Sequence, residues 1–196
     1  MRLVFIFLFI LSSFSFAPIS AAENGTGTGA GIGYQPMIFN INIEDPNGDV
    51  DSIAGLYPLS AFYAIDGGRD IRYLINASYV SGEVDAGVKQ IGQEFTAIFF
   101  GAGIQRKFRL GRSWKPWVGA SVTYINAKYQ KRYEVDADGF LVTQYPDRDE
   151  SGFGLTVTAS SYWPLNDNFD IGLHAAIDVP INTDITRAGI GLSLLF

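Results

Sequence analysis

The 196-residue sequence contains no cysteine, and charged residues make up only 17% of it. Without cysteine there is no disulfide framework, so hydrogen bonding and packing must supply the stability of the fold. Soluble domains carry about 25% charged residues. Basic residues are also scarce, with 14 Lys and Arg against 20 Asp and Glu. This deficit disfavours nucleic acid as a partner, because phosphate binding needs a basic surface.

Beyond its N-terminus the sequence also lacks an apolar run of the length of a transmembrane helix; the best run covers residues 97–104. A helix needs about 20 apolar residues to cross a bilayer. The mature chain is therefore either a soluble periplasmic protein or a membrane β-barrel, since a closed barrel satisfies its own backbone groups in lipid. The 22 glycines and the 14% aromatic content favour strands and tight turns over helices.

The first 22 residues have the features of a secretory signal peptide. Arg2 supplies the positive charge, residues 3–11 are an unbroken apolar run, and Ser20, Ala21 and Ala22 provide a small-residue cleavage site. The alternative, a membrane-anchoring helix, is disfavoured because the run is too short to span a bilayer. We expect cleavage after Ala22, a flexible lead-in over residues 23–28 and a barrel domain over residues 29–196.

The C-terminal half alternates apolar and polar residues with a period of two. The even positions from 188 to 196 and the odd positions from 169 to 179 are all apolar. Side chains alternate across a strand, so these segments are predicted to be two-faced strands. The second face carries Gly, Ser, Thr and isolated charges, which suit a narrow barrel lumen. A soluble sandwich, the alternative, usually covers its wet face with Lys and Glu.

The pattern predicts eight strands, at 29–43, 52–65, 70–80, 93–109, 116–130, 152–162, 168–178 and 185–196. Short turns alternate with connections that are on average longer and more acidic, as in outer-membrane barrels. Pro36 and Pro58 predict irregularities in the first two strands, because proline cannot donate to the hydrogen-bond ladder.

Aromatic residues gather at the predicted strand ends, as in the interfacial girdles of membrane barrels. Trp114, Trp117 and Trp163 fall at two short turns and are predicted to form the periplasmic half of such a girdle. The predicted outer half consists of Tyr79, Tyr129 and Tyr133.

The sequence ends at Phe196, after the apolar positions Ile190, Leu192 and Leu194. This ending resembles the C-terminal signature that the barrel assembly machinery reads in bacterial outer-membrane proteins. With the signal peptide and the loop asymmetry, the mature chain resembles the small barrels typified by the OmpA membrane domain, OmpX and OmpW. The resemblance implies an all-β fold, an eight-stranded antiparallel transmembrane β-barrel in the Gram-negative outer membrane, in contact with lipid and lipopolysaccharide.

Proteins of this group include membrane anchors, adhesion or complement-resistance factors and narrow channels. The resemblance therefore implies a non-enzymatic protein with a structural role or with loop-mediated interactions at the cell surface. A narrow channel for small or apolar solutes is the alternative, and a lipid A-modifying enzyme is a more distant one. No cofactor is expected.

Nine polar residues are predicted to face the lumen of the barrel. An eight-stranded barrel is barely wide enough for its own side chains, and a buried charge must be paired because isolated burial is costly. Asp178 and Arg187 flank the last outer loop and are expected to pair. Paired charges would plug the lumen, whereas charges separated by water would line a narrow pore. The predicted network consists of Arg72, Asn76, Gln105, Lys107, Arg109, Asp170, His174, Asp178 and Arg187.

Catalytic and metal-binding interpretations are weaker. His174 has Ser160 or Thr158 as cross-strand candidates for a hydrolase triad. Outer-membrane lipid A deacylases carry a serine two residues after the catalytic histidine, and Ala176 occupies that position here. Residues 45–51 alternate oxygen side chains as calcium loops do, but lack the central Gly and the bidentate Glu. We predict no catalytic residue and no metal site; the acidic segment 131–151 either binds cations that bridge lipopolysaccharide or stays solvated.

Overall fold

The computed structural model describes residues 30–34, 37–44, 50–56, 59–84, 90–110, 114–166 and 169–195. These residues form strands, turns and irregular segments, with no helix among them. Accordingly, the described part contains no helix long and apolar enough to cross a membrane. The prediction of an all-β fold is confirmed. The predicted signal peptide, the lead-in, the calcium-like turn at 45–49 and Phe196 lie outside the described residues.

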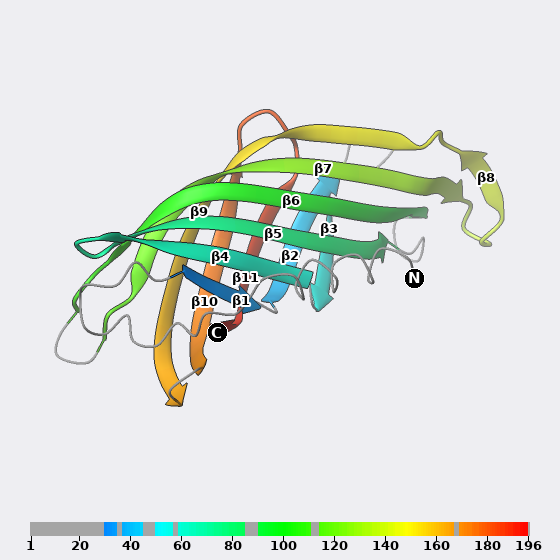
Figure 1. The fold of residues 1–196 in the computed structure, drawn as a ribbon. Coiled ribbons are helices and arrows are strands. Elements are labelled where there is room, and N and C mark those ends of the chain that lie inside the picture. Colours follow the sequence, from blue (N-terminus) through cyan, green and yellow to red (C-terminus); the bar gives the residue numbers. More distant parts are fainter. Residues whose placement is uncertain are drawn as a thin grey trace, which may run out of the picture.

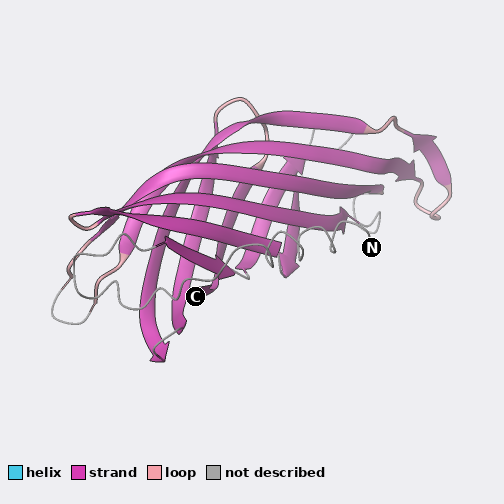
Figure 2. Ribbon diagram, in the orientation of Figure 1, coloured by secondary structure: helices cyan, strands magenta, loops and turns pink. Residues whose placement is uncertain are grey.

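The strands form one antiparallel sheet that curves around a central axis (Figures 1 and 2). In chain order they are β1 (Ala30–Tyr34), β2 (Met37–Glu44), β3 (Val50–Leu56), β4 (Leu59–Gly68), β5 (Ile71–Val84), β6 (Ile91–Lys107), β7 (Trp117–Val135), β8 (Leu141–Gln144), β9 (Arg148–Asn166), β10 (Phe169–Pro180) and β11 (Thr186–Leu195).

The strand pairings close into a circuit of eight strand positions, each called a stave, and some staves consist of two successive strands. From β4 the order runs through β5, β6, β7, β9, β10 and β11, and β1 pairs with both β11 and β4. β2 pairs with β11 and β3, so β1 with β2 forms one stave and β3 with β4 forms another. The described strands therefore have the eight-stranded antiparallel arrangement that the alternation predicts. The circuit closes at a seam between β1 and β11, which is the shortest of these pairings, with two residue pairs in register.

The second stave contains an irregularity. Between Leu56 and Ala61 there are five residue steps, whereas their partners Ile38 and Tyr34 are four steps apart. The pairing register of the two staves thus differs by one residue between β2–β3 and β1–β4. β11 keeps one register against both β1 and β2, so the bulge predicted in the first stave does not shift that pairing. The two prolines, Pro36 and Pro58, lie outside the described residues.

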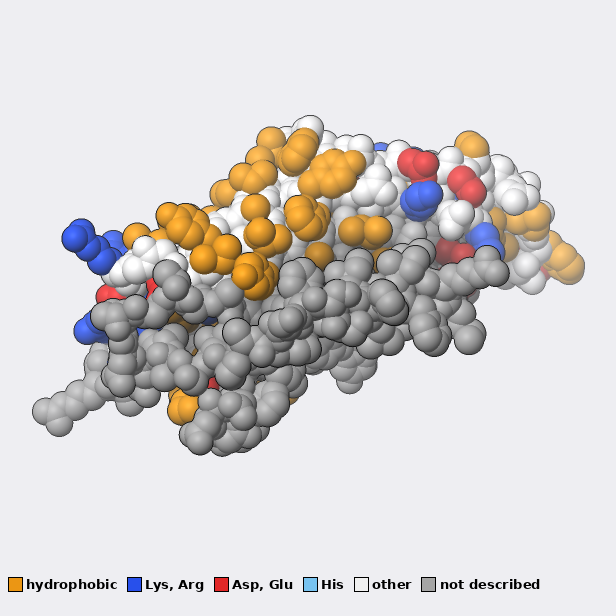
Figure 3. Space-filling model, viewed as in Figure 1, with side chains coloured by type: hydrophobic (Ala, Val, Ile, Leu, Met, Phe, Trp, Pro, Cys, Tyr) orange, Lys and Arg blue, Asp and Glu red, His pale blue; other side chains and the backbone are white. Residues whose placement is uncertain are grey.

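An apolar band covers the outside of the barrel. Figure 3 shows hydrophobic side chains gathered across the middle of one face, with charged side chains toward its two ends. A soluble protein rarely exposes such a large apolar patch, whereas a barrel in lipid carries an outward apolar band. The exposed members of the band include Tyr73, Ile75, Ile98, Phe100, Ile104, Val122, Leu155, Leu173, Ile177, Ile190 and Leu192.

The barrel has a short end and a long end. The inner end carries the β4–β5 and β6–β7 turns. The outer end is the opposite one. At the outer end β7 runs to Val135, and β8 continues the register of β9 against β7. Residues 131–151, which we predicted to be a loop, therefore contain strand, because backbone pairing continues where the apolar alternation stops. Residues 131–150 are named the outer arm.

Candidate functional site

The centre of the lumen holds a buried ion pair between neighbouring strands. Arg187 on β11 and Asp178 on β10 both point inward, and their side chains are 8% and 1% exposed. Arg187 Nε lies 2.7 Å from Asp178 Oδ2 without the alignment of a hydrogen bond, and Nη2 donates to Oδ1 at 3.3 Å. The two charges thus compensate each other where water is excluded, which a buried pair requires.

Hydrogen bonds extend this pair across the lumen. Arg187 Nη1 donates to Ser78 Oγ on β5 at 2.7 Å, three staves away around the circuit. On the other side Thr156 Oγ1 donates to Asp178 Oδ1 at 2.6 Å and lies 2.5 Å from Thr123 Oγ1. The resulting chain joins β5, β7, β9, β10 and β11 through the interior, so it braces the barrel from within.

A second buried cation lies toward the inner end. Arg72 on β5 donates through Nε to Gln105 Oε1 at 2.7 Å and through Nη2 to Ser160 Oγ at 3.0 Å. Its guanidinium carbon lies 4.4 Å from the centre of the Trp117 ring and 5.1 Å from that of Tyr162. Arginine therefore makes both donor and stacking contacts here, which lysine cannot reproduce.

His174 lies beside this arginine network and is buried. Its register partners are Ser160 on β9 and Gly191 on β11. Ser160 Oγ accepts a hydrogen bond from Arg72, so this serine belongs to the arginine network.

An apolar cluster lies in the outer half of the lumen. Eight side chains pack together there, from strands β5, β6 and β7 and from the loop that precedes β11. Phe95 and Tyr129 stack in a tilted arrangement with ring centres 5.3 Å apart. Ile185, which comes directly before β11, is fully buried among them. This apolar cluster consists of Val80, Phe95, Ala97, Phe99, Ile125, Ala127, Tyr129 and Ile185.

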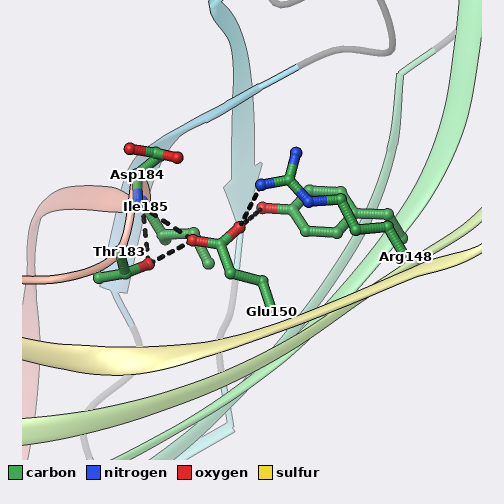
Figure 4. A network of polar contacts seen from close by, with 6 residues as sticks. Arg148, Glu150, Thr183, Asp184 and Ile185 are labelled. Carbon is green, nitrogen blue, oxygen red and sulfur yellow. Dashed lines mark hydrogen bonds and ion pairs between the residues drawn. The ribbon is translucent and has the colours of Figure 1, made fainter.

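The loop that carries Ile185 is fastened to Glu150 at the outer mouth (Figure 4). Glu150 Oε1 accepts hydrogen bonds from Thr183 Oγ1 at 2.6 Å and from the Asp184 amide at 3.0 Å. Its Oε2 accepts one from the Tyr129 hydroxyl at 2.9 Å and lies 3.6 Å from Arg148 Nη2. These contacts hold the β10–β11 loop against the barrel with Ile185 pointing into the lumen.

Glu150 and Ile185 are functional candidates that the sequence analysis missed. Glu150 was grouped with the other acidic residues of segment 131–151, and Ile185 was counted as the first residue of a strand. The sequence did indicate that Ile185 points into the lumen. It is apolar and lies two residues before the lumen-facing Arg187, so an extended chain would place both side chains on the same face. Nothing in the local sequence distinguishes Glu150 from the carboxylates near it, since its partners on residues 183 and 184 are distant in the chain.

Eight of the nine predicted lumen residues divide into two groups. Arg72, Gln105, His174, Asp178 and Arg187 are buried inside the barrel. The half-buried positions also have inward parity: Asn76 is in register with Gly101, Asp170 is near the inner end of β10, and the Lys107 ammonium lies 5.2 Å from the centre of the Trp117 ring.

Arg109 does not belong to the lumen network, and its prediction was wrong. β6 ends at Lys107, two residues before it. The side chain of Arg109 is 70% exposed and pairs with Asp70 in the β4–β5 turn at 3.3 Å. The alternation therefore no longer defines an inward face at this position, because the residue lies beyond the strand.

The residues of the predicted aromatic girdle divide between the outside and the inside of the barrel. Trp114 and Trp163 are 50% and 44% exposed at the inner end, and Tyr79 is 44% exposed on the outward face of β5. Trp117 instead has inward parity and stacks on Arg72. Tyr129 is fully buried in the apolar cluster. Both corrections follow from the lumen, whose ends are filled by aromatic side chains and not only by small polar ones.

The C-terminal strand has the predicted outward face. Ile190 and Leu192 are 66% and 48% exposed. Leu194 is in register with Ile171 on β10 and with Tyr34 on β1, so it lies at the seam of the circuit. Their role in assembly stays a prediction.

No family model and no curated protein matches the chain. Among solved structures it is similar to Neisserial surface protein A, with a TM-score of 0.56 and 14% identity over 85% of this chain and 97% of that one. It is also similar to the attachment invasion locus protein Ail of Yersinia pestis, with a TM-score of 0.50 and 13% identity over the same shares. The chain has the fold of the small eight-stranded β-barrels. Identities of 13% and 14% show a shared strand arrangement and no more. The functional site of this chain therefore has to be derived from its own residues.

Proposed function

We propose that this protein is an integral barrel of the bacterial outer membrane, exposed at the cell surface, that acts through its outer arm and has neither a catalytic role nor an open pore. The apolar band supports the membrane location, because it covers the outward positions of neighbouring strands. The signal-peptide features of residues 1–22 and the apolar alternation that ends at Phe196 support export and assembly in that membrane.

The filled lumen supports a role other than conduction. Arg187 reaches from β11 to β5, and Arg72 reaches from β5 to β9. Above them the apolar cluster closes around Ile185. A water-filled path through these side chains would require breaking the buried ion pair or withdrawing Ile185. The alternative of a narrow channel is therefore less well supported than an occluded barrel.

The observation that carries the proposal is the apolar tip of the outer arm. Phe140, Leu141 and Val142 follow one another and are 71%, 63% and 60% exposed. Leu141 and Val142 begin β8, which lies at the end of the long strands β7 and β9 (Figure 1). Consecutive apolar residues with this degree of exposure are typical of interaction sites.

A capped turn holds this tip in place. Asp136 Oδ1 accepts hydrogen bonds from the Asp138 amide at 3.0 Å and from the Phe140 amide at 2.8 Å. Gly139 adopts a φ of 86°, a left-handed conformation that glycine adopts without steric cost. The turn is thus pre-organised, which lowers the ordering cost of binding.

The charge of the arm indicates which partners suit it. The arm contains six carboxylates, at 134, 136, 138, 147, 149 and 150, against three basic residues, at 131, 132 and 148. Ail has been solved with a heparin analogue, sucrose octasulfate. The acidic arm of the present chain disfavours such a polyanion, because like charges repel across an interface. We propose a protein partner with an apolar contact surface and a basic rim.

Attachment of cells that display the protein tests this proposal. We expect expression in a non-adherent Gram-negative host to raise attachment to cultured epithelial cells several-fold. The double substitution Phe140→Ser and Leu141→Ser should return attachment to the level of the empty vector, at equal surface amounts. Thr143→Ser, an exposed change on the same strand, is the matched control and should behave as the parent protein.

Two results would count against the proposal. Unchanged attachment by the double variant would show that the tip is not the contact. Absence of attachment by the parent protein, together with steady conductance of the purified barrel in a planar bilayer, would favour the channel alternative.

A further inference from the structure

The inner end of the barrel presents an apolar and basic hairpin. Beyond β6 the chain continues as a narrow ladder, in which the Phe108 amide donates to Pro116 O at 2.8 Å and the Leu110 amide to Trp114 O at 2.9 Å. Phe108, Leu110 and Trp114 are 43%, 53% and 50% exposed. Because all three side chains are exposed, the apolar surface extends past the end of β6.

Arg106 interrupts this apolar surface. It is exposed and is in register with Ile71 on β5 and Val118 on β7. Along its own strand the neighbouring outward residues are Ile104 and Phe108, and its guanidinium carbon lies 6.0 Å from the centre of the Phe108 ring. A cation thus lies on the outer surface of the barrel with apolar side chains on either side of it.

Further cations lie around the same rim. Arg109 is exposed and is fixed beside the β4–β5 turn by Asp70. Arg69, in that turn, is also exposed. Between this rim and the outer end, the outward positions 73–79 of β5, 98–104 of β6 and 118–124 of β7 contain no charged residue. Exposed positive charge therefore begins where the apolar band gives way to the aromatic residues of the inner end.

We propose that the surface around Arg106 binds the phosphate of an anionic phospholipid in the periplasmic leaflet of the outer membrane. The proposal rests on the membrane location proposed above. Aromatic rings of membrane barrels lie at headgroup level, so Phe108 and Trp114 place Arg106 at the depth of the phosphates. Its planar guanidinium can donate two parallel hydrogen bonds to one phosphate, and Arg109 adds a second positive charge.

The rim favours an anionic lipid over a zwitterionic one. A zwitterionic headgroup has no net charge, and its ammonium group weakens the attraction between its phosphate and the cations of the rim. Among the described residues of the β4–β5 turn, Asp70 is paired with Arg109, and Asp66 accepts a hydrogen bond from the Gly68 amide. Excess positive charge is therefore better neutralised by a headgroup with net negative charge.

Lipid retention by the purified protein tests this inference. The folded barrel is placed in nanodiscs that contain phosphatidylglycerol and phosphatidylcholine in equal amounts, and native mass spectrometry counts the lipids retained after release. We expect the parent protein to keep phosphatidylglycerol preferentially. Arg106→Gln should lose most of that preference, Arg106→Lys should keep part of it, and Lys128→Gln, which removes an exposed cation from the outer part of β7, should keep all of it.

Equal retention of the two lipids by the parent protein, or an unchanged preference in Arg106→Gln, would overturn the inference. A second set of nanodiscs that also contains lipid A distinguishes the leaflets: preferential retention of lipid A through Arg106 would overturn the periplasmic assignment. Failure of the parent barrel to enter nanodiscs in folded form would instead contradict the membrane location proposed above.

Discussion

The guanidinium of Arg187 lies 4.1 Å from the centre of the Phe99 ring, and this contact marks where the interior of the barrel changes character. On the inner side of it the lumen contains the hydrogen-bonded network of Arg72 with Gln105 and Ser160. On the outer side it contains the apolar cluster closed by Ile185. Arg187 takes part in both, because it pairs with Asp178 while its flat face covers an aromatic ring.

We predict that loss of either member of the central ion pair destabilises the barrel strongly. Arg187→Ala leaves the carboxylate of Asp178 buried without a countercharge, and breaking such a pair costs about 3–5 kcal/mol. Asp178→Ala should have an effect of similar size. The measurement is the urea concentration at the midpoint of unfolding in lipid vesicles. The gel mobility of the unboiled protein reports the folded fraction at each urea concentration. The double variant should recover part of the loss, and purely additive effects would contradict the direct coupling of the two charges.

The apolar band predicts a sharp difference between two exposed leucines. Leu173 lies on the outward face of β10 and Leu141 lies at the tip of the arm, at 57% and 63% exposure. Leu173→Arg places a charge in the lipid and should cost about 2–4 kcal/mol near the middle of the membrane. Leu141→Arg, the matched control, should leave insertion unchanged because that residue meets water. Similar insertion yields of the two variants in vesicles would show that the band does not face lipid.

The stacking of Arg72 on Trp117 predicts that lysine cannot replace this arginine. Arg72→Lys keeps the positive charge but removes the planar group that contacts two rings and donates to Gln105 and Ser160. We expect a loss of unfolding free energy of about 1–3 kcal/mol from unsatisfied buried partners. In a background with Trp114 and Trp163 replaced by Phe, the emission of Trp117 should also shift. Arg106→Lys, on the outer surface, should leave both readouts unchanged; an unaffected Arg72→Lys would contradict the structural role given to stacking.

The contacts of Glu150 predict that acid releases the β10–β11 loop. Burial by itself raises the pKa of this carboxyl, but hydrogen bonds from Thr183, the Asp184 amide and Tyr129 outweigh it and hold the pKa below its ordinary value of 4.5. A lowered folded-state pKa means that the stabilisation is complete above pH 4.5 and is lost as the pH falls through the lower value. The methyl resonances of Ile185 should shift in that range as its burial is lost.

Two variants control this prediction. Glu150→Gln should remove the pH dependence of the Ile185 signals, whereas Asp149→Asn, at the exposed neighbouring position, should preserve it. A pH profile that is the same in Glu150→Gln and in the parent protein would assign the transition to another group.

The C-terminal alternation predicts a role in assembly. Deletion of Phe196, or substitution of Leu194 by Asp, should lower the yield of inserted barrel in cells. Purified variants should still fold in detergent if the defect lies in recognition by the assembly machinery. Normal insertion of both variants in cells would show that the ending is not read as a signal.

The sequence by itself determined which face of a strand meets the surroundings where the alternation is unbroken, as it is on β10. On β10 the odd positions Leu173, Ile177 and Val179 are exposed and the even positions His174 and Asp178 are buried, as their period of two predicts. Each such assignment depends only on residues two apart in the chain, so it needs no knowledge of the partner strands. The same local rule placed Asp178 and Arg187 on one side of a hairpin.

Only the tertiary structure decided what meets inside the barrel and where the interior changes from polar to apolar. Arg72 and Ser160 are 88 residues apart in the chain, and Arg187 and Ser78 are 109 apart. Contacts of this kind depend on the register of every intervening strand pair, which sets the height of each side chain along the barrel axis. Local alternation gives the face of a residue and not its height, so it could not show that Trp117 stacks on a buried arginine inside the barrel.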